Sequence, residues 1–134
     1  MCVTNNGRSP LYAASFDGHY NTVELLLKNG ADVNLLTKNG TGPLYAACEN
    51  GHAKTVQLLL NHGGEVNLPG NDGKSPLFVA CLNGFEEIVQ LLIDNGASSN
   101  VTTDDGTSPL DIACEKGHTV IADMLRKNVA ESKF

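Results

Sequence analysis

The sequence is poor in large side chains: it contains no tryptophan, and aromatic residues make up 5% of its 134 positions. A core with so few rings has to be built from leucine, valine, isoleucine and alanine, which fill short distances between packed elements. The apolar share of 41% is ordinary for a folded protein and excludes a disordered chain. The length fits one domain.

Basic residues are also scarce, since nine lysines and arginines stand against 15 aspartates and glutamates, for a net charge of −6. Phosphate binding depends on clustered lysine and arginine, so the sequence argues against a nucleic-acid partner. The excess of acid is concentrated between residues 73 and 105, where Lys74 is the one basic residue among five acidic ones. Such a block is either a solvated face or a field that attracts a basic protein partner.

No apolar run is long enough to span a bilayer, and Met1 is not followed by the charged and then apolar segments of a leader peptide. We therefore expect no membrane insertion and a cytoplasmic protein, with the nucleus as the alternative compartment. The motifs G-x-x-x-x-G-K and H-E-x-x-H do not occur. We expect no cofactor, no metal ion and no catalytic residues.

What the sequence does contain is a period of 33 residues. Shifting the chain along itself by this distance aligns five columns of identical residues: Gly7, Gly40, Gly73 and Gly106; Pro10, Pro43, Pro76 and Pro109; Leu11, Leu44, Leu77 and Leu110; Ala14, Ala47, Ala80 and Ala113; Gly18, Gly51, Gly84 and Gly117. A period of this length is typical of stacked-repeat proteins. We expect a single domain, residues 1–134, with four repeats at about 4–36, 37–69, 70–102 and 103–134.

Each unit predicts a helix, a return helix and a protruding loop. Ser9 can cap a helix that starts at Pro10, and Gly18 can end it after Asp17 in the left-handed conformation. A second helix follows over about residues 20–29. Dipeptides such as Asn39-Gly40 then predict a turn or short hairpin between units. Helices this short do not persist alone in water, so neighbouring repeats have to stabilise them.

These residues resemble the ankyrin repeat over nearly the whole chain. Residues 40–52 read G-T-G-P-L-Y-A-A-C-E-N-G-H, residues 58–60 read L-L-L and residues 30–34 read G-A-D-V-N. The resemblance implies an all-α ankyrin-repeat solenoid of stacked helix-turn-helix units with projecting β-turn or hairpin loops. It further implies protein–protein interaction as the function and the loop asparagines Asn34, Asn67 and Asn100 as positions that are hydroxylated in some ankyrin proteins.

Three departures from the ankyrin pattern carry predictions. Gly42 has no side-chain oxygen where the other repeats have serine, so the second repeat should have the weakest helix start. The usual histidine after Pro-Leu is Tyr12, Tyr45, Phe78 and Asp111, so aromatic packing should replace a polar network there. Arg126 stands in a leucine or isoleucine column and Val129 in a glycine column. We expect this last repeat to be a terminal cap, and the uncapped first repeat to have been cut from a longer array.

Cysteine and histidine also follow the period. Cys48, Cys81 and Cys114 align with Ser15, and packed helices are too far apart for equivalent cysteines to bond, so we predict buried reduced thiols over a metal site or disulfides. We expect Cys2 to be exposed. His19, His52 and His118 align with Phe85, which favours a packing role over catalysis, and His62 is expected on the surface at a helix end.

The positions that do not recur are free to serve binding. Loop tips and first helices should align along one concave side of the stack, where apolar anchors among polar residues would form a recognition strip, although scattered exposed apolar residues are also ordinary. The candidate binding residues are Arg8, Phe16, Asp17, Leu36, Lys38, Thr41, Glu49, Asn50, Asn71, Lys74, Leu82, Asn83, Asp104 and Glu115.

We therefore predict a monomeric, non-enzymatic module, a scaffold or adaptor that binds a protein or peptide. The alternative is a short ankyrin-type inhibitor that covers the surface of an enzyme. An enzymatic role has no supporting group of residues in the sequence.

Overall fold

The computed structural model describes residues 9–37, 40–70, 73–99 and 101–132, with side chains up to residue 128. The described part of the chain forms eight helices: α1 (Pro10–Asp17), α2 (Tyr20–Lys28), α3 (Pro43–Glu49), α4 (Ala53–Asn61), α5 (Pro76–Asn83), α6 (Glu86–Asp94), α7 (Pro109–Glu115) and α8 (Thr119–Ser132). The described ranges contain no β-strand.

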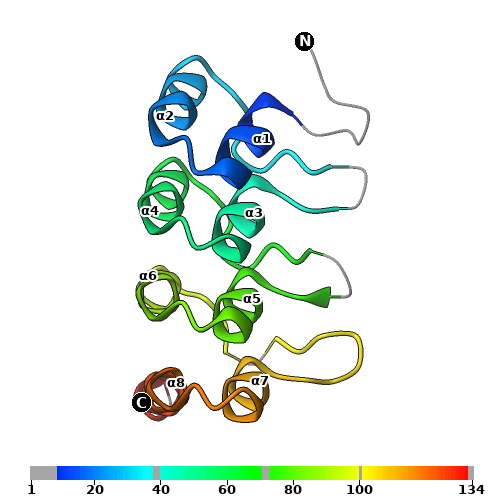
Figure 1. The fold of residues 1–134 in the computed structure, drawn as a ribbon, viewed down its shortest axis with the longest axis vertical. Helices are drawn as coiled ribbons and strands as arrows, with labels where there is room; N and C mark the ends of the chain where they lie inside the picture. Colours follow the sequence, from blue (N-terminus) through cyan, green and yellow to red (C-terminus); the bar gives the residue numbers. More distant parts are fainter. Residues whose placement is uncertain (1–8, 38–39, 71–72, 100, 133–134) are drawn as a thin grey trace.

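The helices pack as four pairs stacked in chain order (Figure 1). The first helices, α1, α3, α5 and α7, form one column, and α2, α4, α6 and α8 form a second column beside it. The segments that join the pairs project from the first column on the side away from the second (Figure 1). The predicted all-α stack of helix-turn-helix units with projecting loops is confirmed.

Serine and proline start the first helices. The hydroxyl oxygens of Ser9, Ser75 and Ser108 each accept a hydrogen bond from the backbone N–H three residues later, and a proline follows each serine. Gly42 occupies the same position before α3 and gives no side-chain cap. The structure thus confirms that the second repeat lacks the side-chain cap that the other three helix starts share.

Glycines with positive φ end the first helices, as at Gly18 (φ 73°), where the backbone turns into the left-handed region after α1. The second helices also end just before a glycine, with Gly30 at φ 88° after α2. Val129 replaces that glycine in the last repeat, and α8 continues to Ser132, 14 residues in all. Loss of the closing glycine therefore coincides with a longer helix, because a β-branched residue is disfavoured in the left-handed region.

The projecting loops close with backbone hydrogen bonds across their bases. The Thr37 N–H donates to the Thr41 carbonyl at 2.8 Å, and the Thr103 N–H donates to the Thr107 carbonyl at 2.9 Å. In the last loop the Asp105 carboxylate accepts from the hydroxyls of Thr103 and Thr107, which holds the pKa of Asp105 below its ordinary value. Hairpin-like turns were predicted at these positions, and the hydrogen bonds confirm them.

The core runs through the whole stack as columns of equivalent aliphatic residues. Val23, Val56 and Val89 are each fully buried, and Ala122 continues their column in the last repeat. Buried side chains from all four helix pairs belong to one hydrophobic cluster, and adjacent pairs pack on one another, so no single repeat could bury its apolar surface alone. This arrangement places the recurring residues inside and leaves the others for the surface.

Candidate functional site

The predicted binding residues lie where two kinds of element meet the solvent: the projecting loops and the C-terminal ends of the first helices. Leu36 and Asp104 are on loops, and Glu49, Asn83 and Glu115 close or nearly close α3, α5 and α7. Seven of the predicted residues are exposed: Asp17, Leu36, Glu49, Asn50, Asn83, Asp104 and Glu115. The helix-end residues are ordered by the stack itself, since the Asn83 amide donates to the Glu49 carbonyl of the preceding repeat at 3.2 Å.

Phe16 and Leu82, predicted as apolar anchors, are half-buried. The Phe16 ring stacks on Tyr12 with 6.3 Å between ring centroids, and Leu82 packs against the hydrophobic core. Both side chains therefore contribute to the helix framework, and their removal would weaken folding as well as any binding. Lys74 is half-buried too, with its carbonyl closing a loop base by accepting from the Gly70 N–H at 2.7 Å.

Thr41 is not available to a partner, and its prediction as a binding residue is corrected. Its side chain is buried, its hydroxyl lies 2.8 Å from the Thr37 hydroxyl, and it is 3.5 Å from the Tyr12 hydroxyl of the preceding repeat. A threonine at the base of the loop points inward, because it joins the two sides of the loop and ties them to the helix column. Arg8, Lys38 and Asn71 lie outside the described residues.

Sequence reasoning missed Leu35, which is as exposed as Leu36, at 42% for each. A Cβ atom at position 42 would lie 3.5 Å from a methyl carbon of Leu36 and 3.5 Å from a methyl carbon of Leu68. Exposed and half-buried leucines of successive loops thus lie near one another at the foot of the loops. The adjacent pair Leu35-Leu36 in an otherwise polar loop was the signal in the sequence.

Two of the three periodic cysteines are buried thiols, as predicted, and the third is not. Cys48 and Cys81 are fully buried, and burial raises the pKa of Cys81 to about 12 and that of Cys48 in the same direction. Cys114 is exposed, because no further helix pair lies over α7 in the described structure. All three are free, and the described residues contain no group of histidine, cysteine and carboxylate side chains that could hold a metal ion. Cys2 lies outside the described residues.

Two of the periodic histidines, His52 and His118, pack against the preceding repeat and form hydrogen bonds that sequence reasoning missed, while His19 is exposed. His52 Nε2 lies 3.0 Å from the Phe16 carbonyl, and His118 Nε2 lies 3.3 Å from the Leu82 carbonyl, each in the repeat before. The His52 ring lies directly over Gly18, where a Cβ atom would be 2.5 Å from the imidazole. The shared period of these glycines and histidines was the available signal. His62 is exposed at the end of α4, as predicted.

The loop asparagines connect neighbouring repeats. The side-chain Oδ1 of Asn34 accepts from the Glu65 N–H at 2.9 Å, and its side-chain Nδ2 donates to the Gly63 carbonyl at 3.3 Å. Asn67 makes the equivalent pair of bonds one repeat later. These amides therefore have a structural role, and their hydroxylation stays a prediction. Asn100 lies outside the described residues.

The acidic block of the sequence is divided in space. Glu86, Glu87 and Asp94 lie on α6, in the second column of helices, while Asp104 and Asp105 lie on a loop that projects from the opposite side (Figure 1). The block therefore does not form one acidic patch. The acidic charge of the predicted binding residues comes instead from three different repeats, through Asp17, Glu49, Asp104 and Glu115.

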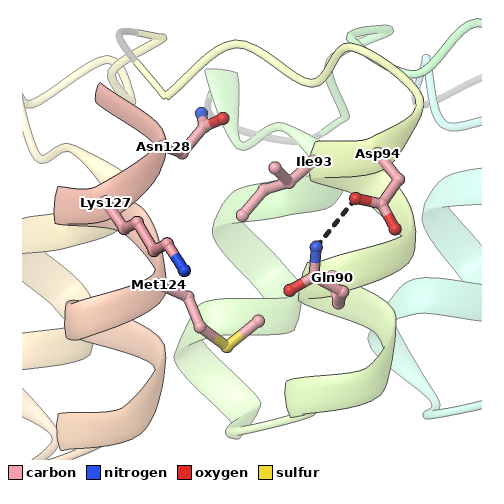
Figure 2. A pocket seen from close by; sticks show the side chains of 6 residues that line it. All are labelled: Gln90, Ile93, Asp94, Met124, Lys127 and Asn128. Atoms are coloured by element: carbon pink, nitrogen blue, oxygen red, sulfur yellow. Dashed lines mark hydrogen bonds between the residues drawn. The ribbon is translucent and has the colours of Figure 1, made fainter. Parts of the chain in front are cut away.

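A hollow of about 480 Å³ lies on the other side of the molecule, between α6 and α8 (Figure 2). Ile93 and Met124 face it from the two helices, Lys127 and Asn128 flank it on α8, and the Gln90 amide donates to Asp94 at 2.8 Å on α6. A similar hollow lies between α2 and α4, lined by Tyr20, Lys54, Gln57, Leu58 and Asn61. Because similar hollows occur at two pairs of second helices, they reflect the spacing of packed helices rather than a specific binding site.

The family model described as ankyrin repeats (3 copies) matches this chain over residues 1–69 and again over residues 64–133. No curated protein matches the chain. None of the described helices combines the length and the apolar composition that crossing a membrane requires.

Proposed function

Because the chain belongs to the ankyrin repeat family, whose repeats are generally protein–protein interaction modules, we propose that it binds a protein or peptide through its loops and first-helix ends. The family is typically non-enzymatic. We call the proposed surface the recognition strip and define it by its exposed residues: Asp17, Leu36, Glu49, Asn50, Asn83, Asp104 and Glu115.

The observation that carries the proposal is the separation of recurring from non-recurring residues. The recurring leucines, alanines and glycines build the core and the turns, while the columns of the recognition strip vary between repeats. Asp17 aligns with Asn50, Asn83 and Lys116, and Leu36 aligns with Pro69 and Thr102. Stability constrains these exposed positions less than the buried ones, so they are the ones that can be fitted to a partner. An exposed leucine among polar side chains is the arrangement expected of an interface anchor.

The charge of the recognition strip favours a basic partner. Its ionisable members are all acidic, and the lysines among the described residues of the loops and first-helix ends are half-buried Lys74 and exposed Lys116. An acidic strip raises the rate of association with a basic segment and does so less at high salt. We accordingly propose a basic protein or peptide as the occupant.

Capture of binding proteins by the immobilised chain tests the strip. We expect Leu36→Glu to reduce the captured amount by about tenfold or more, since a charge at a buried interface anchor costs over 1.4 kcal/mol. Val120→Glu is the matched control, because Val120 is 52% exposed on α8, in the second column of helices. Circular dichroism should show both variants folded.

The outcome contradicts the proposal if Leu36→Glu captures as much as the unchanged chain, or if Val120→Glu causes the loss instead. Capture should also weaken when the salt concentration is raised, if the partner is basic. The inhibitor alternative is distinguished by the identity of the captured protein, which would then be an enzyme whose activity falls as the chain is added.

A further inference from the structure

Twelve residues of the first helix pair recur unchanged in the second pair, and six of the twelve are more exposed than their counterparts. Pro10, Ala13, His19, Thr22, Leu25 and Leu26 are followed 33 positions later by Pro43, Ala46, His52, Thr55, Leu58 and Leu59. We call the first set the end face. Because the two sets contain the same residues at equivalent positions of two repeats, their surroundings can be compared directly.

The two sets differ in burial although their residues are the same. Leu25 is 61% exposed and Leu58 is 7% exposed, while Thr22 is exposed and Thr55 is 1% exposed. Pro10 is exposed where Pro43 is buried, and Ala13 and Leu26 are half-buried where their counterparts are fully buried. Every member of the end face is thus more accessible than its twin.

The second set is covered by the helix pair before it. α1 packs on α3 and α2 packs on α4, and the His52 ring lies over Gly18 with Nε2 3.0 Å from the Phe16 carbonyl. The set therefore forms a surface that is complementary to the far side of a helix pair. His19 has the same ring, no helix of the described residues ends over it, and its Nε2 lies 3.9 Å from exposed Asp17.

A hollow of about 350 Å³ adjoins the end face. Its lining includes Pro10, Leu11, Leu26, Ala31 and Leu35. At the equivalent place in the second pair, Pro43, Leu44 and Leu59 are buried. An apolar hollow at the outer end of the stack is what an uncovered interlayer contact leaves.

We propose that the end face docks a further ankyrin-type helix pair, stacked on α1 and α2 as these are stacked on α3 and α4. The occupant has to present a helix that ends in a left-handed glycine, so that the His19 ring can lie over this glycine as the His52 ring lies over Gly18. It also has to present a free backbone carbonyl near the glycine, as Phe16 does to His52. It also has to bring an apolar second helix against Leu25 and Leu26. A repeat of this protein's own kind meets these requirements.

A second copy of the described chain meets them only in part, because its α7 is followed by left-handed Gly117 (φ 74°) but the surrounding surface is polar. Its opposite end carries Asp111, Cys114 and Arg126, all exposed, where the inner repeats have buried or half-buried aromatic, thiol and aliphatic side chains. Arg126 there binds Asp123 at 3.2 Å and lies 3.6 Å from the Cys114 sulfur. Head-to-head contact of two end faces would place histidine against histidine and offer neither ring a helix end.

Duplication of the first repeat tests the proposal on the full chain. The variant runs from residue 1 to 36 and then from 4 to 134, so that Leu36 precedes Thr4 as it ordinarily precedes Thr37. Hydrogen exchange of the amides of α1 and α2 in the second copy should slow by about tenfold or more, because the added layer removes fraying at the end of the stack. The thermal midpoint should rise as well.

The matched control is the same duplicated chain with Leu25→Glu in the second copy, which should lose the slowing because a charge would face the docked pair. Unchanged exchange in the duplicated chain would overturn the proposal. Sedimentation of the unmodified chain provides a second test. A dimer that Leu25→Glu dissociates would overturn the proposal, because the occupant of the end face would then be a second copy.

Discussion

At the scale of single residues, small differences between equivalent positions decide how well each repeat is formed. Gly42 begins α3 with φ −107° and ψ 173°, close to the extended conformation of Ser75 before α5, yet only Ser75 offers a hydroxyl to the helix. A missing cap could be predicted from sequence alone, because the cap is made within four consecutive residues. The interior position of Thr41 could not, since its partners come from both sides of a loop and from the previous repeat.

Replacement of Gly42 by serine should stabilise the protein. The serine side chain would accept from the Tyr45 N–H, and the loss of glycine lowers the entropy of the unfolded chain, for a combined gain of about 0.5–1 kcal/mol. A Cβ atom at position 42 meets Leu36 and Leu68 at 3.5 Å, an ordinary contact distance. Urea unfolding measures the change, and Ser75→Gly serves as the reverse control with a comparable loss. A destabilised Gly42→Ser protein would contradict this account of the helix start.

At the scale of elements, the helices and turns follow from local rules, while their connections do not. Proline, serine and glycine set the start and end of α1 and α5 at the predicted residues. The bonds that join one repeat to the next, from Asn34 and from His52, connect residues about one period apart. Their periodic positions were visible in the sequence, but the identity of the backbone groups they reach depends on how two pairs pack.

Replacement of Asn34 by alanine should therefore weaken the contact between the first two repeats. Two hydrogen bonds to the backbone of residues 63 and 65 are lost, at a cost of about 1–2 kcal/mol in the free energy of unfolding. Asn61→Ala is the control, since the exposed Asn61 side chain accepts a hydrogen bond from Gln57 of its own helix and does not bridge two repeats. Its loss should cost less than about 0.5 kcal/mol. Equal losses for the two variants in urea unfolding would count against the bridging role.

At the scale of the whole molecule, each layer depends on its neighbours, and the two ends differ from the interior. Cys48 and Cys81 are covered by the layers that follow them, while Cys114 occupies the same position in the last layer and is exposed. The sequence places all three in one column, and only the position of the layer in the stack separates them. Leu25 and Leu58 also occupy one column, and Leu25 is exposed while Leu58 is buried because only Leu58 lies in an inner layer.

Alkylation of thiols under native conditions should report this difference. We expect iodoacetamide to modify Cys114 at least about 100 times faster than Cys48 and Cys81, because the buried thiols have raised pKa values and react only when the layers open. Mass spectrometry of the digested protein assigns the modified residues. In urea the three rates should converge. Rapid modification of Cys48 in the folded protein would show that the interior layers are open.

The sequence by itself determined the repeat, the helix boundaries set by proline and glycine, and the all-α stack, because these rest on local conformational preferences repeated at a fixed period. The tertiary structure alone decided which members of each column are covered. It turned Thr41 inward, divided the acidic block between two sides and exposed Cys114 and Leu25 at the two ends. Burial depends on the neighbouring layer, and equivalent residues have different neighbours at the ends of a stack than in its middle.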